Sequence, residues 1–156
     1  MQRLVTAFVL LVGLMAQGSE ENIRLSLVET ELQGDGVSAG LQKMIRVNQD
    51  GVAYGILQGA QGEVHKVYLR VFLKKEMDDL ETKISEVDNG SHTHRAAQCL
   101  ALPTKRFAYH AANDSISLYE ASAPCGASDR NEAPATSALI NILDALQLSF
   151  QEELET

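Results

Sequence analysis

One serine stands in a motif that is typical of hydrolytic enzymes. Residues 36–40 read GVSAG, which matches the G-x-S-x-G nucleophile elbow and would make Ser38 a catalytic nucleophile. The elbow requires a strand before the serine and a helix after it, so that the hydroxyl stands at a sharp turn. A strand pattern follows Ser38 in this chain. We therefore expect a glycine-rich hairpin loop here, and a small serine hydrolase that uses Ser38 is the alternative.

Two histidines stand two residues apart in a polar stretch. In SHTH, residues 91–94, an extended backbone would place His92 and His94 on the same side of the chain. A zinc or copper site needs further ligands, for which His65, His110 and Asp88 are conceivable. A periplasmic metal-binding protein that uses His92 and His94 is one alternative. The other, which we expect, is a pair of solvated side chains in a loop, with no metal and no cofactor.

The first residues have the composition of a secretory signal. Arg3 precedes an apolar run over residues 4–15, and the small residues of AQG follow it, as at a signal-peptidase site. The apolar run is shorter than the about 20 residues that a membrane span requires. We therefore expect a signal peptide over residues 1–18, a single domain over residues 19–156, and a periplasmic or secreted protein. An uncleaved membrane anchor is the alternative.

The chain has two cysteines, Cys99 and Cys125. An even number of cysteines in an exported protein favours a disulfide. A bridge between them would close a loop of about 26 residues, for which loop entropy gives about 3.5 kcal/mol of stabilisation. Neither cysteine belongs to a C-x-x-C motif, so their spacing does not indicate a redox or metal site. We expect a structural disulfide.

The charge of the chain narrows the classes of partner. The sequence holds 13 Lys and Arg residues against 21 Asp and Glu residues, a net charge of −8. Nucleic acids and anionic membranes attract clustered Lys and Arg side chains. We therefore expect neither nucleic acid nor, after signal cleavage, a membrane as the partner. An acidic protein of this kind is compatible with a protein partner, and its oligomeric state does not follow from the sequence.

Hydrophobic periodicity predicts the secondary structure. Alternating apolar residues predict a four-strand antiparallel meander, with strands within residues 22–32, 41–47, 52–58 and 63–73. The period then lengthens to that of a helix over residues 74–90. A second hairpin is expected over residues 106–121, and a last helix begins at Pro134. Residues 90–105 and 122–134 show no regular pattern and are expected to be irregular.

These elements predict an α+β fold. A four-strand meander and a second hairpin form an antiparallel sheet, which packs with two helices. The order of the elements from about residue 51 to residue 150, with ALPTKRFAYH before the second hairpin, resembles emfourin-type small protease inhibitors. The resemblance implies a protein-binding module. We therefore expect an exported, non-enzymatic protein-binding module, such as a protease inhibitor. Its hairpin tips at residues 34–40 and 59–62 are one candidate recognition surface that could present backbone to the partner, and the alternative, which we expect, is that they are passive connections.

Overall fold

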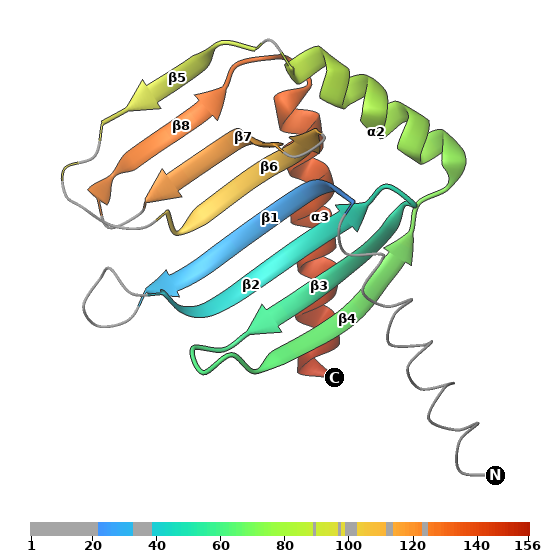
Figure 1. Ribbon diagram of the computed structural model, residues 1–156, viewed down its shortest axis with the longest axis vertical. Coiled ribbons are helices and arrows are strands. Elements are labelled where there is room, and N and C mark those ends of the chain that lie inside the picture. The colour runs from blue at the N-terminus through green and yellow to red at the C-terminus, as the bar shows by residue number, and fades with distance from the viewer. Residues whose placement is uncertain are drawn as a thin grey trace, which may run out of the picture.

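In the part of the chain that the structure describes, eight strands form one sheet, and two helices pack against it (Figure 1). The computed structural model describes residues 22–32, 39–88, 90–96, 98, 103–111, 114–122 and 125–156. The strands are β1 Ile23–Leu32, β2 Ala39–Asn48, β3 Val52–Gln58, β4 Val64–Val71, β5 His92–Arg95, β6 Lys105–Ala111, β7 Asp114–Ser122 and β8 Ala127–Asn131. The helices are α2 Lys74–Val87 and α3 Thr136–Glu155.

The sheet is antiparallel throughout, and its strand order is β4-β3-β2-β1-β6-β7-β8-β5. The predicted meander is confirmed as β1 to β4. The predicted second hairpin is confirmed as β6 and β7, and β6 pairs with β1. The two predicted pieces of sheet are therefore one continuous sheet, and the α+β class is confirmed.

The turn between β2 and β3 fixes the register of the meander. Gly51 has a φ of 78°, a left-handed conformation that favours glycine. Its amide donates to the carbonyl of Asn48 at 3.0 Å, and the Asn48 Oδ1 accepts from the amide of Val52 at 2.8 Å. This hairpin confirms the turn expected from the sequence NQDG.

One face of the sheet is covered by the helices. Figure 1 shows α3 running behind the strands and α2 lying across one end of them. Alternate residues of the strands meet the apolar stripes of both helices in one core. The core residues from the strands include Leu25, Leu27, Ile45, Val47, Ala53, Phe107, Tyr109 and Leu118, and those from the helices include Leu80, Ile84, Val87, Leu139, Leu143, Leu146 and Phe150.

Two strands were not predicted, because they lie in segments expected to be irregular. β5 has the sequence HTHR and all four of its residues are exposed, while β8 has the sequence ASDRN. Neither segment has alternating apolar residues from which a strand could be recognised. Both are held instead by backbone pairing, β8 with β7 and β5 with β8. The expectation of irregular structure in both segments is therefore wrong for β5 and β8.

A buried asparagine joins the two helices to the end of β8. Asn131 is 1% exposed. Its Nδ2 donates to the carbonyl of Val87 at the end of α2, at 3.0 Å. Its Oδ1 accepts from the amide of Ala133 at 2.9 Å and from Thr136 Oγ1, at the start of α3, at 3.2 Å. These bonds satisfy a buried amide and fix where both helices meet the sheet.

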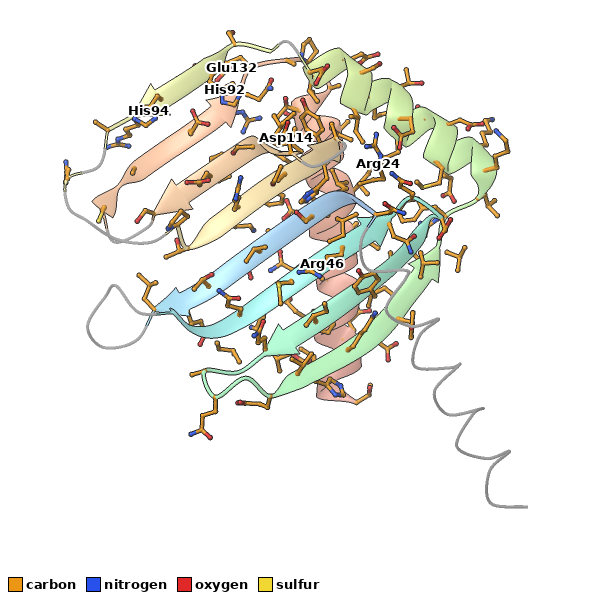
Figure 2. All side chains as sticks on the ribbon, viewed as in Figure 1. Arg24, Arg46, His92, His94, Asp114 and Glu132 are labelled. Atoms are coloured by element: carbon orange, nitrogen blue, oxygen red, sulfur yellow. The ribbon has the colours of Figure 1, made fainter. Side chains whose placement is uncertain are left out.

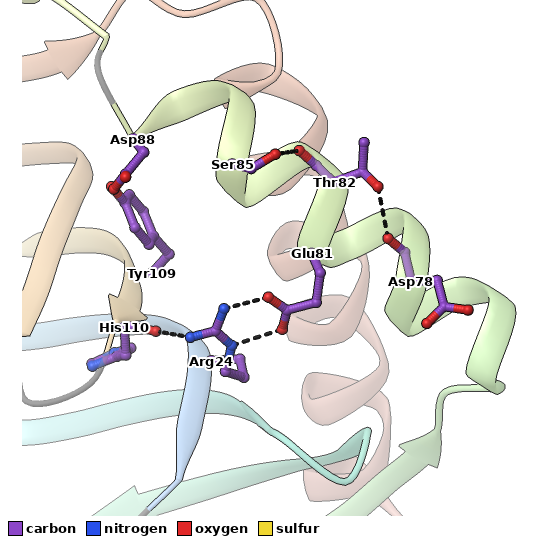
Figure 3. A network of polar contacts seen from close by, with 8 residues as sticks. All are labelled: Arg24, Asp78, Glu81, Thr82, Ser85, Asp88, Tyr109 and His110. Atoms are coloured by element: carbon purple, nitrogen blue, oxygen red, sulfur yellow. Dashed lines mark hydrogen bonds and ion pairs between the residues drawn. The ribbon is translucent and has the colours of Figure 1, made fainter.

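Figure 3 shows a second connection, between α2 and the strands. The guanidinium of Arg24 in β1 donates Nε to Glu81 Oε1 in α2 at 2.7 Å, pairs with Glu81 Oε2, and donates to the carbonyl of His110 in β6. Beside it, Tyr109 donates its hydroxyl to Asp88 Oδ1 at 2.8 Å. Burial, together with this bond, raises the pKa of Tyr109 to about 12. The phenol therefore remains a donor at neutral pH.

Candidate functional site

The face of the sheet opposite the helices carries polar and apolar side chains that are not part of the main core. We call it the open face. Side chains alternate between the two faces of a strand, and Leu25, Ile45 and Ala53 point to the helices. Their neighbours in sequence, such as Ser26, Arg46 and Tyr54, therefore lie on the open face. Figure 2 shows Arg46 in the middle of this face, with His92 and His94 at one edge.

A single row of paired residues crosses the whole open face. Successive cross-strand pairs run in the order His94, Asp129, Glu120, Arg106, Val28, Met44, Ile56 and Lys66. The row is charged from β5 to β6 and apolar from β1 to β3. The open face therefore has a charged half and an apolar half, which meet between β6 and β1.

The charged half contains the two histidines of the SHTH motif. His92 Nδ1 lies 2.8 Å from Asp129 Oδ2, and His94 Nδ1 lies 4.0 Å from Asp129 Oδ1. The strand β5 therefore places both rings on one side, as expected for an extended segment. The expected loop is therefore a strand, and His92 contacts a carboxylate across the sheet, but both histidines are exposed to solvent as expected.

The further metal ligands considered from the sequence lie elsewhere. His65 is on β4, at the opposite edge of the sheet from β5. Asp88 accepts the Tyr109 hydroxyl, and His110 contacts Ser26. Within the described ranges, no group of three or more His, Cys, Asp and Glu side chains could hold a metal ion. The structure therefore does not bring these five residues together.

The apolar half holds a patch that is only partly covered. Met44, Tyr54 and Ile56 form a small cluster that is separate from the main core, and Val28 and Val52 pack against it. On the edge strand β4, Val64, Tyr68 and Val71 remain 62%, 71% and 66% exposed. We call these eight residues the open-face patch. Cross-strand pairing joins most of them in three groups, which are Val28 with Met44 and Ile56, Tyr54 with Tyr68, and Val52 with Val71, whereas Val64 pairs with Gln58.

A lysine borders the aromatic residues of this patch. Lys66 Nζ lies 4.1 Å from the centroid of the Tyr54 ring and 5.6 Å from that of Tyr68. A cation over a ring is attracted by the negative face of the aromatic system. Lys66 thus holds a positive charge on the open face next to apolar surface.

A serine and a histidine lie in contact beside the patch. Ser26 Oγ is 2.8 Å from His110 Nε2, and Ser26 is only 7% exposed. Burial lowers the pKa of His110, and the charges of Arg106, Arg46 and Arg24 lower it further. The imidazole is therefore neutral at neutral pH and can share a hydrogen bond with the Ser26 hydroxyl.

Acid should weaken the fold through His110. Because its folded-state pKa lies below the ordinary value of 6.5, the unfolded chain takes up the proton first as the pH falls. The contribution to stability is complete above about pH 6.5 and is lost as the pH falls through the folded-state pKa. Urea unfolding between about pH 7.5 and 5 should therefore show a steeper loss in the native chain than in His110→Gln. Equal slopes would contradict this assignment.

A pocket on the helix side of the sheet is the other candidate site. A pocket of about 430 Å³ between α2 and α3 is lined by Arg70, Phe72 and Leu146, among others. Its cation is already engaged, because Arg70 pairs with Glu76 at 2.6 Å and stacks on Phe72 at 4.3 Å. Asp79, the other charged residue that lines the pocket, pairs with Lys83. Each charged group of the pocket therefore has a partner, so the open face is the stronger candidate.

Several residues selected from the sequence lie outside the described residues. Ser38, Cys99 and the segment 1–18 are among them. Cys125 is described and is 1% exposed. The amide of Gln98 donates to the carbonyl of Cys125 at 3.1 Å, so the chain passes Cys125 directly before position 99. The disulfide therefore stays a prediction.

Sequence reasoning did not find Arg46, Ser26 or Tyr68 as site residues. The alternation that predicted the strands also divides each strand into two faces. The sequence does not show that both helices cover the same face, so it does not show which of the two faces is open.

Comparison with known protein families, with characterised proteins and with solved structures finds no significant match. In the described part of the chain, no helix is long and apolar enough to cross a membrane.

Proposed function

We propose that this chain is an exported, non-enzymatic protein-binding module that binds its partner with the open face of the sheet. The observation that carries the proposal is the open-face patch. Both helices lie on the other face, yet Val64, Tyr68 and Val71 are more than half exposed beside a buried apolar cluster. Contiguous exposed apolar surface on a sheet face is a mark of interaction sites.

The charges around the patch indicate the chemistry of the partner. The whole chain has a net charge of −8. In contrast, the open-face positions of residues 26–30, 42–48, 52–58 and 64–71 hold Arg46 and Lys66 and no carboxylate. Complementary charge favours correct association and disfavours wrong partners. The partner should therefore present apolar side chains next to carboxylates or other anionic groups.

The class of partner to test first is an exported protease, because the order of elements resembles emfourin-type inhibitors. Export and the Cys99–Cys125 bridge belong to the same proposal. The bridge is supported by the burial of Cys125 and by the bond from the Gln98 amide to the Cys125 carbonyl. A bridge at this place would fix the chain that leads from β5 into β6.

Removing the exposed part of the patch should abolish binding. In the variant Val64→Ser with Tyr68→Ser, both changed side chains are exposed on an edge strand, so the fold should be retained. We expect a loss of affinity of at least about tenfold, because apolar and aromatic contacts dominate the energy of protein interfaces. The measurement is capture from an extract of exported proteins, followed by titration of the captured partner against native chain and variant.

Leu148→Ser is the matched control, because Leu148 is 62% exposed on α3, the element that covers the other face. It removes a similar exposed apolar side chain and should leave the affinity unchanged. Capture alone does not support the proposal. Equal affinities for native chain and β4 variant, or a loss only in Leu148→Ser, would refute the open face as the binding surface.

A further inference from the structure

A second row of paired residues crosses the open face next to the one described above. It runs through Tyr54 of β3, Arg46 of β2, Ser26 of β1, Ala108 of β6 and Ser117 of β7. Apart from Ala108, every member carries a polar group that can donate a hydrogen bond. The row passes through the middle of the face and crosses from the apolar half into the charged half between Ser26 of β1 and Ala108 of β6.

Arg46 is the cation of this row, and no acidic partner holds it. Arg24 pairs with Glu81, and Arg106 Nε lies 3.4 Å from Glu120 Oε2. Among the described residues, the Arg46 guanidinium has no carboxylate within 4.0 Å, and its hydrogen-bond contact is Met44 Sδ at 3.6 Å. A guanidinium carries five donors in a rigid fork. Most of those donors are therefore available to a ligand.

The hydroxyls of the same row are buried and incompletely bonded. The Tyr54 hydroxyl and the Ser117 Oγ are buried and have no hydrogen-bond partner in the described part of the chain. Tyr54 is 2% exposed, and it lies directly across from Arg46 in the register. A buried donor without an acceptor costs free energy, which a bound acceptor would recover. The Tyr54 hydroxyl is an observation independent of Arg46, and like the guanidinium it can donate to an oxyanion, whereas Ser117 on β7 lies three strands from Arg46 and is not part of the site.

We propose that Arg46, with the neighbouring hydroxyls of Ser26 and Tyr54, binds an oxyanion, a carboxylate or a phosphate, on the open face. The fork of Arg46 can hold two oxygens of such a group. His110 Nε2 lies 2.8 Å from Ser26 Oγ, and in the tautomer that carries its proton on Nε2 it donates to that oxygen and leaves the serine proton for the oxyanion. The inference deepens the proposed function, because a carboxylate of the partner protein is one source of the oxyanion. A phosphate group is the other source.

The test is titration of the isotope-labelled protein, followed by amide resonances, with two probes at constant ionic strength. One probe is inorganic phosphate and the other is N-acetylglutamate. We expect saturable shifts at the amides of Ser26, Arg46 and Tyr54 with at least one probe. Saturation by phosphate alone identifies a phosphate as the ligand, and saturation by N-acetylglutamate identifies a carboxylate.

Variants of arginine distinguish this site from general attraction of anions. Arg46→Gln should weaken the saturating probe by at least about tenfold. Arg46→Lys keeps the charge without the fork and should give an intermediate loss. Arg95→Gln is the matched control, because Arg95 is an exposed arginine on the edge strand β5, and it should change nothing. Shifts that grow without saturation, or equal affinities in the native chain and Arg46→Gln, would overturn the proposal.

The outcome is separable from that of the proposed function. The probes are small ions that do not require the exposed side chains of β4. A site that saturates while the Val64 and Tyr68 variant binds the partner normally would keep the oxyanion site and refute the docking surface. Loss of partner binding in that variant with no saturable response to either probe would keep the docking surface and refute the oxyanion site.

Discussion

Truncating Phe150 to alanine should lower the free energy of unfolding by about 3–5 kcal/mol. Phe150 is 1% exposed and lies on α3 against β3, the strand next to the edge strand β4. Its ring fills the space left by a glycine, because a Cβ on Gly55 of β3 would lie 2.3 Å from Phe150 Cδ2. Removing the ring therefore leaves a cavity between α3 and β3. Urea unfolding of the purified variant measures the change, and Leu148→Ala on the same helix should change stability by less than about 0.5 kcal/mol.

The contact between Gly55 and Phe150 can be tested as a pair. Gly55→Ala alone should cost about 1–3 kcal/mol, because the added methyl group overlaps the ring. In the Phe150→Ala background the same substitution meets no ring and should cost almost nothing or partly fill the cavity. A double-mutant cycle therefore predicts a strongly non-additive pair. Additive effects would show that the helix does not pack on β3 as described.

Reducing the proposed bridge between Cys99 and Cys125 should have the second large effect. Loop entropy assigns it about 3.5 kcal/mol, which corresponds to a loss of several degrees in melting temperature. The double variant Cys99→Ser with Cys125→Ser should lose a similar amount in the absence of reductant and should not respond to reductant. Calorimetry of both proteins with and without reductant gives the comparison.

The oxidation state itself is measured by alkylating the native protein after unfolding without reductant. Mass spectrometry should find neither Cys99 nor Cys125 labelled. Labelling of both cysteines in protein isolated from an oxidising compartment would contradict the bridge.

The meander could be predicted from the sequence because burial and period agree there. Leu25 and Leu27 in β1, and Ile45 and Val47 in β2, alternate with residues of the other face and are almost fully buried. The same agreement predicted α3, of which Leu139, Leu143 and Phe150 are buried at helical spacing. Glycine in the sequence NQDG supplied the turn between β2 and β3.

The strands β5 and β8 could not be predicted, because they have no alternation of buried apolar and exposed polar residues. His92 and His94 lie in a strand whose four residues are all exposed. The sole buried residue of β8 is Asn131, a polar residue whose amide bonds to both helices. Strands of this kind form because a neighbouring strand offers backbone donors and acceptors. The sequence of such a strand does not show that a neighbouring strand is there to pair with it.

The candidate site was hidden for a related reason. Tyr54 and Arg46 belong to strands that were predicted correctly, but their role depends on which face the helices cover. That choice is made by long-range packing, through contacts such as that of Phe150 with Gly55. The spacing of His92 and His94 indicated a site at that edge, whereas Arg46, which has no carboxylate within 4.0 Å among the described residues, lies in the middle of the open face (Figure 2).

The central claim is that the open face of the sheet binds the partner, and photo-crosslinking tests it most directly. A benzoylphenylalanine is placed at Tyr68, on the open face, or at Leu148, on the exposed side of α3. Each protein is mixed with the captured partner and irradiated. The account predicts a covalent product from the probe at Tyr68 and none from the probe at Leu148. A product from the Leu148 probe, with none from the Tyr68 probe, would contradict it.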